Sequence, residues 1–210
     1  MFLTKDKTDT AKTGAAPRNS ATSSPALEWL WQHFRDVTNP RVLDCGSSQK
    51  STLDILLRRG AKVYVADLVS PLVEPDPAFW DRSGKQPKFL VGKFMAQFPA
   101  IPPGSLTFVL CWHLLDLLPR ESLPSVVERL CSCLEEGGAL FCLLRQPDLA
   151  VGAETNWWLE GLTSFGASAE VKGAFRNPAL TNREMERLVA SGTIKTFLTR
   201  SGRREVLAFK

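Results

Sequence analysis

Short apolar segments alternate with amphipathic segments along most of this chain, and this alternation limits the possible folds more than any other feature. Most of the short segments are apolar along their length, which is typical of strands that are buried on both faces. They are residues 41–45, 62–67, 89–91, 106–111 and 139–144. Because helical patterns separate them, the sequence predicts a parallel sheet with helices on both faces.

The helices of this arrangement are defined by the spacing of their apolar residues and by signals at their ends. They are expected over residues 26–39, 53–60, 121–135 and 181–191. Ser24 can cap the first of them, and Thr181 with Glu184 forms a capping box at the last. A short turn joins the final two strands, residues 193–199 and 205–209. The last strand should therefore run antiparallel to its neighbours.

Two segments fall outside this alternation. Residues 1–25 are rich in Lys, Thr, Ser and Ala without apolar periodicity, so we expect a disordered leader followed by one domain over residues 26–210. Residues 146–180 show weak periodicity but contain Trp157 and Trp158. Two interpretations of this pair stay open: it lines a lid over an apolar or aromatic substrate, or it caps the open end of the sheet.

Charge and apolar content exclude some classes of function. The 26 basic and 22 acidic residues give a net charge of +4, of which residues 1–25 supply +2. The +2 that remains for the domain is too small to indicate nucleic-acid binding. No segment approaches the roughly 18 uninterrupted apolar residues of a membrane span, so no membrane association is expected.

The five cysteines stand at positions 45, 111, 131, 133 and 142. Their number is odd, no CxxC pair occurs, and most of them lie in apolar runs, which indicates buried thiols in a reducing cytoplasm. Cys131 and Cys133 would point to different faces of a helix, and no further ligand lies at suitable spacing. We therefore expect no metal site.

Acidic residues end the first two predicted strands, where an open parallel sheet normally places its ligand. Asp44 ends the first strand and can accept hydrogen bonds from a cationic amino group. Gly46 lets the backbone approach a ligand closely. Asp67 ends the neighbouring strand, where a carboxylate can bind both hydroxyls of a ribose. Together these residues predict a nucleoside site without a phosphate.

A degenerate phosphate-binding loop is the alternative for the same turn, since Lys50 and Ser51 resemble the end of that motif. Asp44 and Gln49 would then stand in place of its two glycines. A carboxylate at position 44 would repel the phosphates that such a loop must hold. This alternative is therefore disfavoured.

The first strand and its turn resemble the first motif of the class I S-adenosylmethionine-dependent methyltransferases. That motif is an apolar pair, an acid and then glycines at alternate positions; here it reads VLDCGSSQK over residues 42–50. Gly46 matches, whereas Ser48 and Lys50 replace the second and third glycines. Asp67 matches the acid that holds the cofactor ribose. The resemblance implies a Rossmann-like α/β fold, with a doubly wound, mostly parallel seven-stranded sheet and an antiparallel final strand.

S-adenosylmethionine is the cofactor that this resemblance implies. The hydroxyl of Ser48 can substitute for an interaction of the second glycine with the cofactor, and the ammonium of Lys50 can bind the methionyl carboxylate. Lys93 stands where the family has an acid beside the adenine amino group. The residues assigned to cofactor binding are Asp44, Gly46, Ser48, Lys50, Asp67, Lys93, Phe94 and Trp112.

Trp112 and His113 follow the fourth strand at the mouth of the expected crevice. In one interpretation, Trp112 packs on the substrate or cofactor and His113 acts as a general base. In the other, both cover the edge of the sheet, and a backbone group satisfies His113.

The resemblance implies methyl transfer to a small-molecule acceptor in a cytoplasmic protein, with a protein or RNA partner as an alternative. No Asn-Pro-Pro-aromatic motif follows the fourth strand, so methylation of amino groups on bases or glutamine is not supported. The altered residues Ser48, Lys50 and Lys93 favour a different hypothesis. In it, the chain is a catalytically inactive, methyltransferase-like scaffold or partner subunit.

Overall fold

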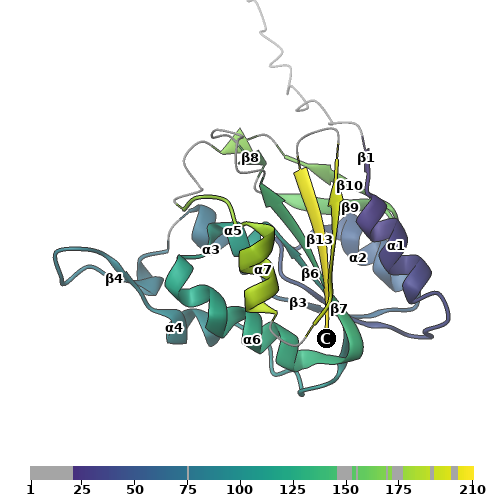
Figure 1. Cartoon of the computed structure of the whole chain (residues 1–210), viewed down its shortest axis with the longest axis horizontal. Coiled ribbons are helices and arrows are strands. Elements are labelled where there is room, and N and C mark those ends of the chain that lie inside the picture. Colours follow the sequence, from purple (N-terminus) through teal and green to yellow (C-terminus); the bar gives the residue numbers. More distant parts are fainter. Residues whose placement is uncertain are drawn as a thin grey trace, which may run out of the picture.

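The computed structural model describes residues 21–74, 76–145, 153–154, 156–168, 170–171, 177–189, 192–199 and 203–210. Within these ranges the central sheet has six strands in the order β12-β13-β7-β6-β2-β3 (Figure 1). Their bounds are Arg41–Asp44 (β2), Lys62–Val65 (β3), Leu106–Trp112 (β6), Leu134–Arg145 (β7), Ile194–Leu198 (β12) and Arg203–Phe209 (β13). Neighbours among β3, β2, β6 and β7 are parallel, and β13 runs antiparallel to both of its neighbours. The mostly parallel sheet and its antiparallel final strand are confirmed.

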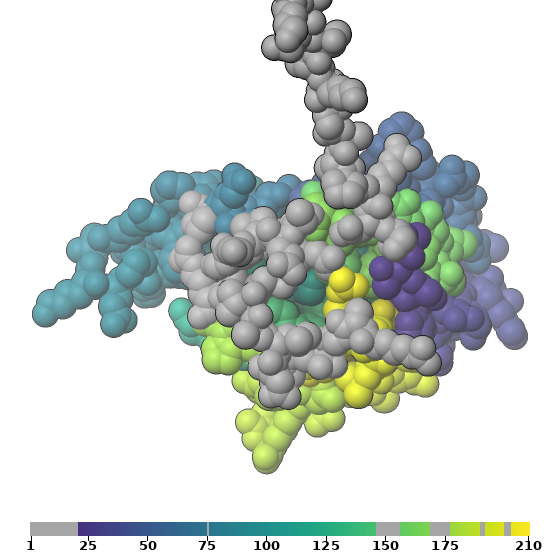
Figure 2. Space-filling view, turned by 90° about the horizontal axis from the view of Figure 1, so that it is seen from above, coloured from purple at the N-terminus to yellow at the C-terminus, as the bar shows by residue number. Residues whose placement is uncertain are grey.

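The expected third strand does not join this sheet, so the prediction of seven strands is wrong by one for the described residues. Lys88–Phe89 (β5) pairs instead with Trp80–Asp81 (β4) in a separate hairpin, which extends to one side of the molecule in both views (Figure 1 and Figure 2). The rings of Phe89 and Phe79 both pack against Phe94, with centroids 5.4 and 5.7 Å apart. This aromatic contact buries the apolar segment without a place in the main sheet.

Helices cover both faces of the sheet. Pro25–His33 (α1) and Lys50–Arg58 (α2) lie on one face. On the other lie Ser70–Val73 (α3), Val91–Met95 (α4), Leu114–Leu117 (α5), Leu123–Cys133 (α6) and Asn182–Leu188 (α7), together with the short 3-10 turns Pro77–Phe79 and Arg120–Ser122. Two hydrophobic cores result: the first lies between the sheet and the face with α1 and α2, and the second lies between the sheet and the face with α3 to α7. Because side chains alternate along β6, Phe108 and Leu110 enter the first core, while Val109 and Cys111 enter the second.

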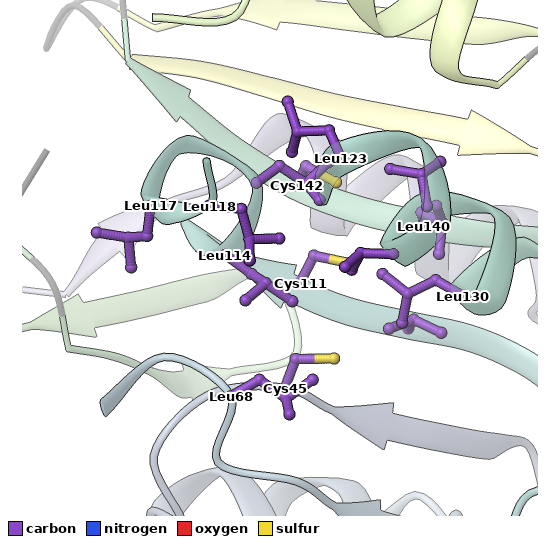
Figure 3. Close-up of a cluster of buried hydrophobic side chains, with 14 of the residues drawn as sticks. Cys45, Leu68, Cys111, Leu114, Leu117, Leu118, Leu123, Leu130, Leu140 and Cys142 are labelled. Atoms are coloured by element: carbon purple, nitrogen blue, oxygen red, sulfur yellow. The ribbon is translucent and has the colours of Figure 1, made fainter. Parts of the chain in front are cut away.

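The second core contains the row of cysteines drawn in Figure 3. Cys111 of β6 and Cys142 of β7 lie near leucines of α5 and α6, whereas Cys45, which follows β2, lies beside Leu68 (Figure 3). All five cysteines are free, and four of them are buried. Hydrogen bonding to Cys111 and burial raise the pKa of Cys142 well above its ordinary value, and burial raises the pKa of Cys131 to about 11. The expectation of buried thiols is confirmed for four of the five.

A second, smaller layer lies on the face that carries α2. Trp157–Gly161 (β9) and Ser164–Ala167 (β10) form a hairpin, and the hairpin joins α2 through a hydrogen bond from Leu159 N to Thr52 Oγ1 at 2.9 Å. Nearby, Ala153–Glu154 (β8) pairs with Glu170–Val171 (β11). For the segment 146–180 a lid was one of two interpretations, and its remaining residues (146–152, 155, 169 and 172–176) lie outside the described residues.

The chain before α1 is tied to both sheets. Thr22–Ser23 (β1) pairs with β10, although a disordered leader was expected to reach residue 25. Ser24 Oγ donates a hydrogen bond to Glu205 Oε2 at 2.7 Å, and Ala26 N donates to the same oxygen at 3.0 Å. Ser24 also accepts from Leu27 N, so its predicted role as the cap of α1 is confirmed. Residues 1–20 lie outside the described residues.

The contact between Ser24 and Glu205 predicts energetic coupling between α1 and β13. Ser24→Ala removes the helix cap, and we expect it to lower the free energy of unfolding by about 1 kcal/mol. Glu205→Ala leaves two donors without their acceptor and should cost roughly 1–3 kcal/mol. In the double variant the loss should be smaller than the sum by about 0.5 kcal/mol or more, as measured by urea unfolding.

Thr181→Ala provides the matched control. Thr181 caps α7 in the predicted capping box with Glu184, and its hydrogen bonds go to that residue rather than to Glu205. Its effect should therefore add to that of Glu205→Ala. Simple additivity of Ser24→Ala with Glu205→Ala would contradict the coupling.

Candidate functional site

The carboxyl ends of β2, β3 and β6 meet at one edge of the sheet. Hydrogen bonds from Cys45 N to Leu110 O and from Ala66 N to Asp44 O, at 3.0 and 2.9 Å, hold the three strand ends in register. This register places Asp44, the last residue of β2, beside the end of β6. Ligands of open parallel sheets bind at this edge, so the edge is the candidate site.

Asp44 and Trp112 are in direct contact at this edge. The indole Nε1 of Trp112 donates a hydrogen bond to Asp44 Oδ1 at 2.7 Å, and Gly46 N donates to the same oxygen at 3.0 Å. Each of the two side chains is only 2% exposed. The carboxylate that was expected to bind a cationic amino group therefore has a protein donor in that position.

The ring of Trp112 also fills the space next to Gly46. A Cβ atom added at position 46 would lie 2.7 Å from Trp112 Cδ1 and 2.9 Å from Nε1. Trp112 reaches this position with a φ of 50°, in the left-handed region that is rare for residues with a side chain. Such a backbone costs on the order of 1–3 kcal/mol. The ring packs edge-on against Phe141, with centroids 5.9 Å apart.

Burial of the carboxyl raises the pKa of Asp44 to about 6, although the hydrogen bonds from Trp112 and Gly46 act in the opposite direction. The negative charge of Asp67 adds to the rise. The carboxyl of Asp44 is thus mostly ionised at pH 7, and it becomes mostly neutral below about pH 6.

Asp67 follows β3 and remains exposed. Its Oδ1 accepts a hydrogen bond from Ser70 N at 2.9 Å, which orients the carboxylate at the start of α3. A groove of about 310 Å³ lies beside it, within the size range of ligand sites. Its lining residues are Ser47, Val69, Ser70, Val73, Glu74, Asn156 and Ser168. Sequence reasoning assigned none of them to a site, because they come together from short loops after β2 and β3 and from the two ends of the distant β9–β10 hairpin.

The two residues that replace the family's glycines lie on the surface. Ser48 is exposed, and Lys50 begins α2 with its side chain 87% exposed. The ammonium of Lys50 pairs with Asp54 Oδ2 at 2.5 Å, one turn along the helix. Lys50 is therefore engaged by its own helix rather than by the crevice.

Two other residues assigned to cofactor binding, Lys93 and Phe94, lie apart from Asp44, Gly46 and Trp112. Lys93 is exposed on α4. Phe94 is fully buried in the second core, between Phe79, Phe89 and Phe98, whereas Trp112 belongs to the first core. The assignment of Phe94 to cofactor binding disagrees with this placement, because its ring is needed for aromatic packing.

His113 lies in the interior, not at the mouth of the crevice. It is 2% exposed, and its Nδ1 lies 3.0 Å from Leu143 O, so the ring donates a hydrogen bond to that carbonyl. Burial lowers the pKa of His113 to about 3, which keeps it neutral. This placement agrees with the interpretation of a histidine satisfied by a backbone group and disagrees with that of a general base.

The two neighbouring tryptophans of the β9 hairpin differ in burial. Trp157 is buried, and its ring lies 5.0 Å from His113, 5.1 Å from Phe165 and 4.6 Å from the guanidinium of Arg203. Trp158 is partly exposed and donates from Nε1 to its neighbour in the hairpin, Glu160, at 2.6 Å. Of the two interpretations, the cap on the sheet describes Trp157.

A buried polar cluster at the ends of β6 and β7 was not found by sequence reasoning. Asp116 accepts hydrogen bonds from Arg145 N at 2.6 Å and from Leu180 N at 3.3 Å, and burial raises its pKa. Arg204 donates to Arg145 O, to Leu180 O and to Asn182 Oδ1. The sequence signal that could have revealed it is Asp116, an acidic residue inside the apolar segment 108–118. The cluster ties the chain before α7 to the sheet.

The described part of the chain lacks two features, a group of metal-ligating side chains and a helix able to span a membrane. There, no group of three or more His, Cys, Asp or Glu side chains is placed to hold a metal ion. None of the helices described above has the length and apolarity needed to cross a membrane.

The raised pKa of Asp44 predicts a pH dependence with a defined sign. Between about pH 4 and pH 6 the folded state binds more protons at this residue than the unfolded state, so stability falls as the pH rises. The full loss is roughly 3 kcal/mol and is complete above pH 6. Asp44→Asn keeps Oδ1 as an acceptor but removes the titration. Urea unfolding should therefore show the wild type gaining stability, relative to Asp44→Asn, as the pH is lowered from about 7.5 to 4.5.

Asp81→Asn is the control for this measurement. Hydrogen bonds from Ser83 lower the pKa of Asp81, so its titration lies below the tested window. This variant should leave the slope unchanged. Parallel pH profiles for the wild type and Asp44→Asn would show that Asp44 has an ordinary pKa and is hydrated.

Known protein families and structures place this fold and site in context. A family model described as "Methyltransferase domain" matches residues 18–188. No curated protein sequence matches the chain. A 1,6-didemethyltoxoflavin-N1-methyltransferase from Burkholderia thailandensis, solved with 1,6-didemethyltoxoflavin and S-adenosylhomocysteine bound, is 17% identical with a TM-score of 0.52. That match covers 89% of this chain and 76% of the other.

A second solved structure gives the same result. The S-adenosylmethionine-dependent methyltransferase from Mesorhizobium loti is 13% identical, with a TM-score of 0.50, and the match covers 89% of this chain and 99% of the other. At such identities the two structures show a common fold and nothing finer. The family model covers most of the chain. The chain therefore belongs to the class I methyltransferase family.

Proposed function

We propose that this protein is an S-adenosylmethionine-dependent methyltransferase that acts on a small molecule. The observation that carries the proposal is the placement of two carboxylates and a glycine at one edge of the sheet, next to a groove. Asp44 ends β2, Asp67 follows the adjacent parallel strand β3, and Gly46 lies in the turn after β2. The groove of about 310 Å³ lies beside Asp67.

The residues at this edge fit the adenosyl part of the cofactor. Asp67 is exposed and is already oriented by Ser70 N, so its carboxylate can accept hydrogen bonds from the ribose hydroxyls. Val69 and Val73 give the groove apolar surface for a base, while Ser47 and Asn156 offer polar groups. The oxygens Ser47 Oγ and Ser70 Oγ lie 3.0 Å apart and link the two loops.

The amino-acid part of the cofactor does not fit in this arrangement. The indole of Trp112 stands against Asp44 and Gly46, the two residues that this part of the cofactor would need. When it is bound, S-adenosylmethionine supplies a methyl group on a positively charged sulfur. His113 is not available as a base for the acceptor, since burial keeps it neutral with a pKa of about 3.

A small molecule is the acceptor that the comparisons favour. The Burkholderia methyltransferase holds 1,6-didemethyltoxoflavin together with S-adenosylhomocysteine. The low net charge of +4 gives no reason to prefer RNA. A catalytically inactive scaffold is the second candidate function, and the closure of the crevice by Trp112 is the observation that favours it.

Asp67→Ala tests the proposal. Isothermal titration of the full chain with S-adenosylhomocysteine should show binding by the wild type and at least tenfold weaker binding by the variant. The reason is that the ribose no longer has a charged acceptor, and such a hydrogen bond is worth about tenfold or more in affinity. Asp76→Ala is the matched control, because Asp76 is also exposed and also accepts from a backbone N–H, that of Ala78 at 2.8 Å.

The control should bind S-adenosylhomocysteine as the wild type does. Equal affinity of Asp67→Ala and wild type would reduce Asp67 to a turn-capping residue. If the wild type binds neither S-adenosylhomocysteine nor 5′-methylthioadenosine at millimolar concentration, the scaffold is the correct function.

A further inference from the structure

We propose that Trp112 selects the ligand of the crevice at the carboxyl ends of β2, β3 and β6. In the closed arrangement the protein recognises adenine nucleosides without an amino-acid tail. A ligand that carries the tail must displace the indole. This inference rests on the proposed function. It concerns which half of an adenosyl ligand the free protein can bind.

The indole imitates the ligand's amino-acid end in two respects. Its Nε1–H lies 2.7 Å from Asp44 Oδ1 and so provides the donor that an ammonium group would provide. Its ring occupies the space against Gly46, where even one methyl group would be 2.7 Å from Cδ1. One side chain thus supplies both the hydrogen bond and the volume of the missing group.

The groove that would receive the nucleoside remains open while the indole is in place. Its lining includes Ser47, Val69, Ser70 and Asn156, and neither Asp44 nor Trp112 is part of it. Asp67 is not part of the lining either, but it adjoins the groove through the hydrogen bond from Ser70 N to its Oδ1. Asp67, the expected ribose ligand, is exposed at the same edge. The two halves of the cofactor site are therefore in different states, one open and one filled by the protein.

Several features make the indole a displaceable group rather than a permanent part of the core. Trp112 has a left-handed backbone, with φ at 50°, and the pairing of β6 with β7 shifts register between Leu110 and Trp112. Asp44 is a buried carboxylate held by two neutral donors. A cationic ammonium makes a stronger, charge-assisted hydrogen bond to a carboxylate than a neutral N–H does. A ligand with an amino group can therefore offset the cost of displacing the indole.

Displacement reduces the apparent affinity of every ligand that requires it. The reduction equals the fraction of molecules in which the crevice is open. The contact of Trp112 with Phe141 and its nearly complete burial keep that fraction small. The amino-acid tail should then add little to the affinity of the wild type, although its groups are complementary to Asp44.

Two ligands that share the nucleoside measure this directly. S-adenosylhomocysteine carries the amino-acid tail, whereas 5′-methylthioadenosine has the same nucleoside and sulfur without it. With the full-length wild type, titration calorimetry should give similar dissociation constants for the two. In Trp112→Leu, S-adenosylhomocysteine should bind at least tenfold more tightly than 5′-methylthioadenosine, whose affinity should stay near the wild-type value.

Trp112→Phe guards against a failure of Trp112→Leu to fold, because it retains an aromatic ring and removes only the donor and part of the volume. It should show the same change to a smaller degree. Trp158→Phe is the matched control, since Trp158 also donates from Nε1 to a carboxylate, that of Glu160 at 2.6 Å, but within the β9 hairpin. This control should keep the wild-type ratio of the two dissociation constants.

The outcomes separate the two proposals. If the wild type already binds S-adenosylhomocysteine tenfold or more tightly than 5′-methylthioadenosine, the inference about Trp112 is wrong and the proposed function stands. The same holds if both Trp112 variants keep the wild-type ratio. If no variant binds either ligand at millimolar concentration, the proposed function fails and the inference fails with it.

Discussion

The hydrogen bond between Trp112 and Asp44 determines the geometry of the candidate site. It exists because β2 and β6 are parallel neighbours whose ends are held in register by Cys45 N and Leu110 O. Three properties of the edge follow from the position of the indole that makes this bond. Asp44 is buried with a raised pKa, Gly46 can carry no side chain, and the open groove forms beside Asp67 instead of above Asp44. The raised pKa follows from the burial of Asp44 and not from the bond itself, which lowers the pKa. A change in the register of the two strands would remove all three together.

The layer around Trp112 supports this closed arrangement. Its ring belongs to the core that α1, α2 and the β9 hairpin share, and that core also contains Phe141 and Trp157. The hairpin is fixed to α2 through Thr52, and α1 is fixed to β13 through Glu205. These anchors are hydrogen bonds between buried groups, which cost more to break than exposed ones. The indole is therefore held by a layer that is itself tied to the sheet.

The sequence predicts what depends on local chemistry. The alternation of strands and helices along the chain, the antiparallel final strand and the caps at Ser24 and Thr181 follow from apolar periodicity, from a short turn and from side chains that bond to nearby backbone. What depends on contacts between distant residues could not be predicted. Phe89 was expected in the main sheet because its segment is apolar, but its ring packs against Phe94. His113 was a candidate base by its position after a strand, and only the fold shows that it is buried against Leu143 O.

The side chain of Trp112 and the altered glycine motif meet at Gly46. Glycines at alternate positions let a backbone approach the amino-acid end of a bound cofactor, and this need disappears where the protein's own indole occupies that place. Ser48 can then lie on the surface, and Lys50 can pair with Asp54 along α2. Asp67, the proposed ribose ligand, keeps the family's residue, and its Oδ1 accepts a hydrogen bond from Ser70 N. The family's residues are thus kept at Asp44 and Gly46, which contact the indole, and at Asp67. The residues that depart from the pattern are exposed on the surface: Ser48, Lys50 and Lys93.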